Sequence, residues 1–113
     1  MITIYHNPRC GKSRECLAFV ETSNEEFEVI KYLETPLSYT KLIEIIGLLK
    51  IRPIELVRVK EPIWVEKFKN QSLSDTQIVQ AMVDFPILIE RPIAVKGKKA
   101  VIARPMEKIK EIL

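Results

Sequence analysis

The sequence predicts an α/β protein whose mixed sheet has about four strands and whose extra helices lie in the middle of the chain. Three observations lead to this prediction. Residues 1–32 carry a strand pattern, a helix pattern and a second strand pattern, residues 38–85 carry helical spacing, and residues 93–113 indicate a hairpin followed by a helix. We therefore expect a βαβ half, a helical insertion at about 38–85, and a ββα half.

The first half of the predicted fold is a βαβ unit. Ile2 to Tyr5 and Phe27 to Tyr32 are predicted as strands, and Gly11 to about Glu21 as the helix between them. The apolar residues on one face of this helix are Cys16, Leu17 and Val20. Two strands joined by a crossover helix in one sheet are parallel and right-handed, so the helix begins at the carboxyl edge of the first strand. Cys10 is expected at that edge.

The insertion is predicted from helix-start signals. Ser38 is a plausible N-cap, Pro53 and Pro62 fit the first turns of short helices, and Ser74 to Gln77 resembles a capping box. The helix after Ser38 carries Leu42, Ile45, Ile46 and Leu49 at helical spacing, and the helix after Ser74 is expected to bury Ile78, Met82 and Phe85.

The last half is predicted as a hairpin and a helix. Strands at Ile93 to Lys96 and Lys99 to Ile102 flank Gly97-Lys98, which suits a tight turn with glycine at its first central position. Pro105 is expected to start the final helix, with Met106, Ile109, Ile112 and Leu113 facing inward. This order of elements is the thioredoxin-like arrangement with added helices. No repeat or linker interrupts it, so a single domain over 1–113 is expected.

Composition limits the function classes. A chain of 113 residues with 47% hydrophobic content can bury one core. Its net charge of +3 is spread among carboxylates, which argues against nucleic acid and suits anionic small molecules, an acidic partner or an ordinary solvated surface. The sequence shows no signal-peptide pattern and no run of apolar residues that could span a membrane, so we expect a soluble cytoplasmic protein.

Cys10 is the strongest candidate for a functional residue. A helix N-terminus offers unpaired amide N–H groups and a positive dipole end, which favour a thiolate and also bind anions. A cysteine at this junction is thus a candidate nucleophile, although free cysteines are often small buried hydrophobes. Cys16 would lie about 9 Å along the helix and roughly 120° around it, beyond disulfide reach, so it is assigned to the core.

Several residues near Cys10 in the predicted fold have more than one open interpretation. His6 could favour the thiolate as an imidazolium, order the loop through hydrogen bonds, or only cap the strand. Arg14 could support Cys10 electrostatically or be a surface arginine. Arg91-Pro92 precedes a strand opposite the start of the first helix, where a cis bond is plausible. From spacing alone, Arg58 and Arg104 are ordinary surface arginines.

The chain resembles the glutaredoxin-linked arsenate reductase family, which is ArsC/Spx-like and has a thioredoxin-like fold. The resemblance rests on five motifs: Ile4-Tyr5-His6-Asn7-Pro8-Arg9-Cys10-Gly11-Lys12-Ser13-Arg14, Tyr32-Leu33-Glu34-Thr35-Pro36, Leu56-Val57-Arg58, Pro86-Ile87-Leu88-Ile89-Glu90-Arg91-Pro92-Ile93 and Ala103-Arg104-Pro105. It implies Cys10 as the catalytic nucleophile and Arg58, Arg91 and Arg104 as the oxyanion-binding residues. The supporting residues are expected to be His6, Ser13, Arg14 and Pro92.

The resemblance also implies an oxidoreductase mechanism for arsenic detoxification. The Cys10 thiolate attacks arsenate, glutathione acts as co-substrate, arsenite leaves, and glutaredoxin resolves the mixed disulfide. No bound cofactor and no metal are expected, and the protein is expected to be a monomer with no nucleic-acid or membrane partner. External thiols are needed because position 13 is serine and Cys16 is out of reach.

Two alternatives stay open. Spx-type transcription regulators are non-enzymatic relatives that bind RNA polymerase and typically carry a Cys-x-x-Cys pair. Ser13 stands at the second position of that pair here, which favours the enzyme. The second alternative is a glutathione-dependent thiol reductase that uses Cys10 on another substrate.

Overall fold

The four strands form one mixed sheet in the order β2-β1-β3-β4. They are β1 (Ile2–Tyr5), β2 (Phe27–Ile30), β3 (Ile93–Lys96) and β4 (Lys99–Ile102). In this computed structural model, which describes residues 1–113, β1 and β2 are parallel and the β1–β3 and β3–β4 pairs are antiparallel. The predicted mixed four-stranded sheet is confirmed.

The chain divides into two units. The first, Met1–Thr35 with Arg91–Leu113, holds the sheet, and the second, Pro36–Glu90, holds the predicted insertion. That the two units act as one domain stays a prediction. No helix in the protein combines the length and apolar character that crossing a membrane requires.

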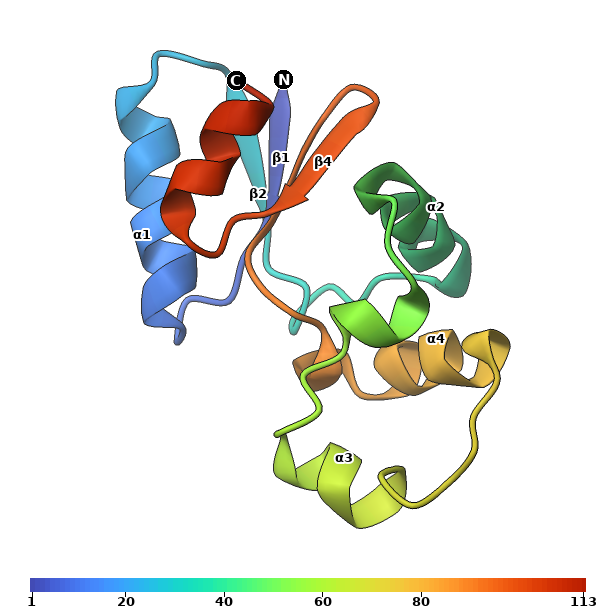
Figure 1. The fold of residues 1–113 in the computed structure, drawn as a ribbon. Helices are drawn as coiled ribbons and strands as arrows, with labels where there is room; N and C mark the ends of the chain where they lie inside the picture. Colours follow the sequence, from blue (N-terminus) through green and yellow to red (C-terminus); the bar gives the residue numbers. More distant parts are fainter. The chain divides into compact units, whose positions relative to one another are not determined.

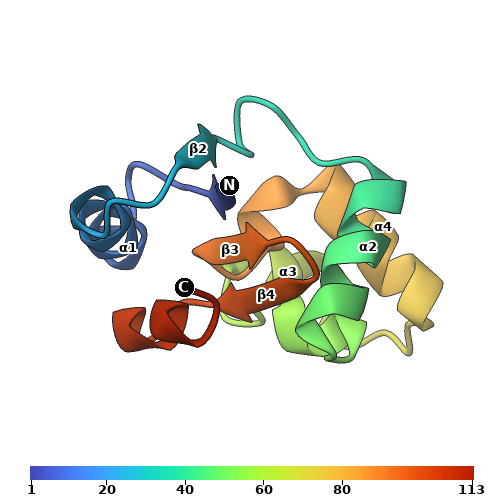
Figure 2. The same ribbon diagram turned by 90° about the horizontal axis from the view of Figure 1, so that it is seen from above.

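One face of the sheet is covered by α1 (Gly11–Thr22) and by a 3₁₀ helix, η3 (Met106–Glu111), which pack against each other (Figures 1 and 2). The core beneath them consists of Ile2, Ile4, Cys16, Val20, Ala94, Ala103, Ile109 and Ile112. Cys16 and Val20 are buried as predicted, whereas Leu17 is only half-buried. This packing fixes the axis of α1, and therefore the position of its first turn.

The second strand is shorter than predicted, ending at Ile30 and not at Tyr32. The amides of Glu34 and Thr35 both donate to the carbonyl of Lys31, at 2.9 Å each, so the chain turns directly after the strand. Tyr32 is buried within this turn. A buried aromatic residue that anchors a turn looks the same in the sequence as one that ends a strand. For this reason the strand was predicted to extend to Tyr32.

The hairpin between β3 and β4 is confirmed. Lys96 pairs with Lys99 across a two-residue loop, and Gly97 has a φ of 62°. That left-handed conformation at the first central position of a hairpin turn is one that glycine adopts without steric cost.

The C-terminal element differs from the prediction. It is a 3₁₀ helix, Pro105 precedes it, and Leu113 is 39% exposed. A 3₁₀ helix has three residues per turn, so residues three apart share a face. Ile109 and Ile112 therefore both reach the core, Met106 is half-buried one turn earlier, and Leu113 turns away. The prediction of α-helical spacing was therefore wrong for residues 106–111.

The second unit is helical. Its elements are α2 (Tyr39–Leu49), the 3₁₀ helix η1 (Pro53–Leu56), α3 (Pro62–Lys67), α4 (Asp75–Asp84) and the 3₁₀ helix η2 (Pro86–Leu88). Ser38 caps α2 by accepting the Lys41 amide at 3.1 Å. The predicted residues Leu42, Ile45 and Ile46 are buried on α2, while Leu49 is half-buried near its end. Pro53 and Pro62 begin η1 and α3 as predicted.

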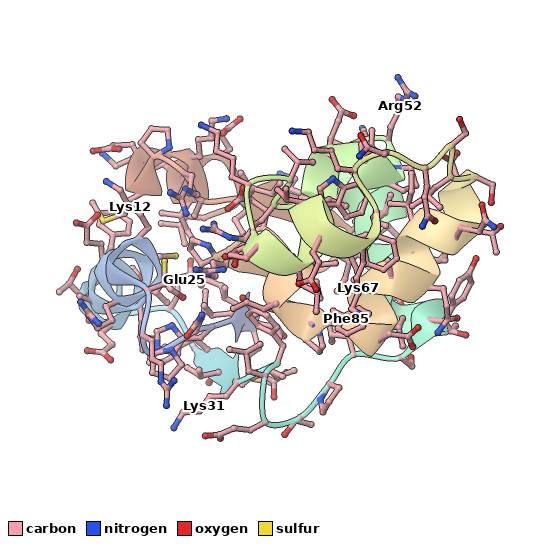
Figure 3. The ribbon with its side chains drawn as sticks, turned by 90° about the horizontal axis from the view of Figure 1, so that it is seen from below. Lys12, Glu25, Lys31, Arg52, Lys67 and Phe85 are labelled. Carbon is pink, nitrogen blue, oxygen red and sulfur yellow. The ribbon has the colours of Figure 1, made fainter.

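The capping box at the start of α4 is confirmed. The Ser74 hydroxyl accepts the Gln77 amide at 3.2 Å, and the Gln77 side chain accepts the Ser74 amide at 2.9 Å. Ile78 and Met82 are buried as expected. Phe85 is only half-buried, and its ring centroid lies 5.8 Å from the ammonium of Lys67. Figure 3 labels both side chains. A partly exposed ring under a cation explains why this residue does not join the core.

Candidate active site

Cys10 is the last residue before α1 and has an extended backbone, with φ −99° and ψ 122°. Its amide donates to the carbonyl of Asn7 at 3.0 Å, and its carbonyl accepts the amide of Arg14 at 3.0 Å. Cys10 therefore ends a tight loop and at the same time supplies the first carbonyl of the helix. Cys10 is a free cysteine that is only partly buried.

The loop before Cys10 is held by buried polar side chains. The hydroxyl of Ser13 accepts the amide of Asn7 at 3.0 Å and lies 2.7 Å from Nδ1 of His6. His6, Asn7 and Ser13 are 4%, 3% and 0% exposed. The Asn7 side chain in turn accepts the amide of Arg9 at 3.0 Å, which is an Asx turn. These bonds connect the loop to the first turn of α1.

The surroundings of His6 favour its neutral form. Burial lowers the pKa of His6 below 6.5, and the charges of Lys31 and Arg14 lower it further. A neutral imidazole can accept the Ser13 hydroxyl proton at Nδ1 while the Ser13 oxygen accepts the Asn7 amide, so one arrangement satisfies all three groups. This geometry favours the loop-ordering role of His6 over the imidazolium role.

Arg14 holds the other side of the loop. Its Nη1 donates to the carbonyl of Pro8 at 3.0 Å, and the residue is exposed on α1. A direct effect of Arg14 on Cys10 stays a prediction, because the contact that the structure gives is one to the loop backbone.

The environment of Cys10 favours the thiolate. Partial burial alone would raise the pKa of the Cys10 thiol, but the amide of Ser13, a hydrogen bond from the Arg91 side chain, the amide of Lys12 and the Arg91 charge together lower it below 9.0. The Cys10 side chain makes no N-cap hydrogen bond, so the amides of Ser13 and Lys12 act on the sulfur through weaker interactions at the N-terminus of the helix. A larger thiolate fraction makes a cysteine more reactive at neutral pH.

Cys16 has the opposite environment. It is buried on the core side of α1, and burial raises the pKa of the Cys16 thiol to about 11. Both cysteines are free thiols. The assignment of Cys16 to the core is therefore confirmed.

Two of the predicted arginine segments lie side by side in the first unit. The Arg91-Pro92 bond is cis, as the sequence indicated, and the Arg104-Pro105 bond is cis as well, which was not predicted. The amide of Ala103 donates to the carbonyl of Pro92 at 2.9 Å, and Nη1 of Arg104 lies 3.4 Å from the carbonyl of Arg91. Residues distant in sequence are thus brought together, and the Arg91 side chain is close enough to Cys10 to lower the pKa of its thiol.

Arg58 belongs to the second unit. Its Nη1 lies 2.9 Å from Oε1 of Glu90 and its Nε lies 3.3 Å from Oε1 of Glu61. An isolated bridge between Val57 and Ile89 aligns the two segments that carry these groups. Two carboxylates hold the Arg58 side chain in place, and its proposed role toward an oxyanion stays a prediction.

Residues 5–112 match the model of a protein family described as the ArsC family. The chain belongs to the ArsC family. It is 46% identical to the uncharacterized protein YfgD of Escherichia coli, with 99% of this chain and 96% of that protein covered. It is 38% identical to an arsenate reductase of Neisseria meningitidis serogroup A, with 99% and 97% of the two chains covered.

A solved structure supports the same assignment. An arsenate reductase from Vibrio cholerae superposes on this ArsC-family protein with a TM-score of 0.94 at 41% identity, covering 99% of this chain and 97% of that one. The predicted thioredoxin-like fold and the family resemblance are confirmed.

Sequence reasoning missed two features of this ArsC-family site. The burial of Ser13 with His6 was not foreseen, although a seven-residue separation across a strand-to-helix loop can bring two side chains together. The influence of Lys31 on His6 was also missed, yet both residues follow the carboxyl ends of neighbouring parallel strands. The protein has no group of three or more His, Cys, Asp or Glu side chains that could hold a metal ion.

Proposed function

We propose that this ArsC-family protein is an arsenate reductase in which Cys10 is the nucleophile and glutathione and glutaredoxin are the external reductants. The observation that carries the proposal is the Cys10 sulfur at the start of α1, where the helix end and Arg91 favour the thiolate. Relatives that are 38–40% identical to the chain and aligned over 99% of it are named arsenate reductase.

The first step is formation of a bond between sulfur and arsenic. The Cys10 thiolate attacks the arsenic of bound arsenate, and an oxygen leaves as hydroxide or, with a proton, as water. The charge of arsenate and of the leaving oxygen is balanced by Arg91 and Arg104, together with the amide N–H groups at the start of α1. Arg58 supplies the third guanidinium, and Pro92 fixes the backbone that carries Arg91.

The second step reduces arsenic. A glutathione thiolate attacks the Cys10 sulfur, a sulfur–sulfur bond forms, and the sulfur–arsenic bond breaks with its electron pair passing to arsenic. Arsenic(V) becomes arsenic(III) and leaves as arsenite, while the two sulfurs are oxidised to a mixed disulfide. Glutaredoxin then attacks the glutathione sulfur, takes up the glutathionyl group and releases the Cys10 thiolate.

External thiols are required because the chain has no suitable second cysteine. Cys16 is buried in the core and its thiol has a raised pKa. Ser13, at the second position of a Cys-x-x-Cys pattern, is buried against His6. A serine at this position would also leave a Spx-type regulator without its disulfide switch.

The proposed need for glutathione and glutaredoxin implies a reducing compartment, so we assign the protein to the cytoplasm. One chain carries every residue of the proposed site, so the protein is proposed to act as a monomer.

The test is a coupled assay in which arsenate-dependent oxidation of NADPH runs through glutathione reductase, glutathione and glutaredoxin. We expect turnover that requires arsenate, glutathione and glutaredoxin together. Turnover with another oxidant but not arsenate would instead identify a thiol reductase of different substrate. A stoichiometric complex with RNA polymerase, in a chain that gives no turnover, would identify the regulator.

A further inference from the structure

A hollow of about 470 Å³, lined by both charged and apolar residues, lies in the first unit, beside the loop that presents Cys10. It is lined by Asn7, Pro8, Arg9, Lys31, Leu33 and Glu34. We propose that this hollow binds the thiol co-substrate, a small peptide with the chemistry of glutathione, through Arg9, Lys31 and Glu34. The inference rests on the proposed function, because it assigns a site to the reductant that the function requires.

The position of the hollow follows from the strand pairing. Tyr5 pairs with Ile30 in the parallel β1–β2 pair, and the amide of His6 donates to the carbonyl of Ile30 at 2.9 Å. The loop after β1 and the turn after β2 therefore leave the sheet at the same edge. Crevices outside the carboxyl ends of parallel strands are where α/β proteins bind ligands. A ligand in this hollow lies against the same loop that ends at Cys10.

The charges of the lining fit the ligand. Glutathione carries two carboxylates and one ammonium group, and the hollow offers two cations, Arg9 and Lys31, and one carboxylate, Glu34. An arginine can bind a carboxylate through two parallel hydrogen bonds, and a lysine binds one as a compact charge. Leu33, which is 38% exposed, supplies apolar surface for the ligand's methylene groups. A volume of 470 Å³ lies in the range of small-molecule sites.

Both walls of the hollow are held by hydrogen bonds. The turn after β2 is closed by the two amides that donate to the Lys31 carbonyl, and it is anchored by buried Tyr32. The opposite wall is closed by the Asx turn of Asn7 and by the bond from Arg14 to the Pro8 carbonyl. The charge of Lys31 also reaches His6, which ties the turn electrostatically to the active-site loop. Figure 3 shows Lys31 projecting outward just beyond the end of β2. Preformed walls reduce the ordering cost of binding.

The test uses S-methylglutathione, which has the same charges but cannot react. Titrated into ¹⁵N-labelled protein, it should shift the amide signals of residues 7–9 and 31–34. Lys31→Glu should weaken its affinity by about five- to tenfold, the range expected for one exposed ion pair that is removed and reversed. Lys98→Glu is the matched control in the same unit, because Lys98 is an exposed lysine of the hairpin turn, and it should leave the affinity unchanged.

Glu34 allows a second, independent comparison. Glu34→Gln should weaken binding of S-methylglutathione but not of its N-acetyl derivative, which lacks the ammonium group. In the coupled assay, Lys31→Glu and Arg9→Ala should raise KM for glutathione and leave KM for arsenate unchanged.

The outcomes separate this inference from the proposed function. Binding in the hollow, without arsenate reduction by the wild-type protein, would leave the inference standing and remove the function. Signals that shift elsewhere or not at all, or equal affinities for Lys31→Glu and Lys98→Glu, would overturn the inference whatever the protein reduces.

Discussion

The hydroxyl of Ser13 lies 2.7 Å from Nδ1 of His6, and both side chains are buried under the loop that ends at Cys10. The same hydroxyl accepts the amide of Asn7. One side chain of α1 therefore fixes two consecutive residues of the loop. We infer that the position of the Cys10 sulfur depends on this pair, although neither residue needs to touch the substrate.

Ser13→Ala is expected to destabilise the protein by about 1–3 kcal/mol, because it leaves the Asn7 amide and His6 Nδ1 without a buried partner. Urea unfolding measures this loss. Ser74→Ala, which removes an exposed cap of α4, should cost about 1 kcal/mol and leave the reactivity of Cys10 unchanged. If Ser13→Ala altered Cys10 alkylation no more than Ser74→Ala does, the loop-ordering role would be wrong.

The pH dependence of stability should report His6, the only histidine in the chain. Burial, with the charges of Lys31 and Arg14, lowers the pKa of His6, so the unfolded state binds a proton more readily than the folded state. The free energy of unfolding should therefore decrease as pH falls from 6.5 through the folded-state pKa, and level off below it. Histidine NMR titration gives the midpoint directly, and a midpoint above 6.5 would contradict the assignment.

The two cysteines should differ sharply in function. Cys10→Ser is expected to abolish arsenate reduction in the coupled assay, whereas Cys16→Ser should retain nearly all of it, since Cys16 is buried and its thiol pKa is about 11. Iodoacetamide should label Cys10 first, with a rate that reaches half its maximum below pH 9.0. Equal loss of activity in the two variants would count against a single nucleophile.

Arg91→Ala should act on both the sulfur and the anion. Loss of its hydrogen bond and charge raises the pKa of Cys10, so the alkylation midpoint moves to higher pH. Binding of sulfate or arsenate should weaken by about 1.5–3 kcal/mol, the contribution of a hydrogen bond to a charged group. Calorimetry measures the affinity, with Arg52→Ala, an exposed arginine of the second unit, as control. Unchanged anion affinity would remove Arg91 from the site.

Local sequence patterns predicted most of the fold. Alternation, capping residues and prolines located the strands, α2, α4 and the hairpin, because each depends on interactions within a few residues. The errors came from tertiary context. The buried Tyr32 anchors a turn, and the 3₁₀ geometry of η3 turns Leu113 away from the core. Neither leaves a pattern that differs from an ordinary strand end or α-helix.

The candidate site was only partly predictable for the same reason. Cys10 could be found from its place at a strand-to-helix junction, since that depends on local chemistry. The approach of Arg104 to Arg91 depends on the pairing of the segments before β3 and after β4, so only the family resemblance indicated it. The Ser13–His6 pair could be identified only from the three-dimensional structure. The same is true of the charge of Lys31 near His6.

The most direct test of Cys10 as the nucleophile is mass spectrometry of the protein quenched after exposure to arsenate and glutathione without glutaredoxin. We predict a glutathionyl adduct on the peptide that contains Cys10, formed only when arsenate is present and removed by adding glutaredoxin. Arsenite formed with no adduct at Cys10, or with the adduct at Cys16, would contradict the account.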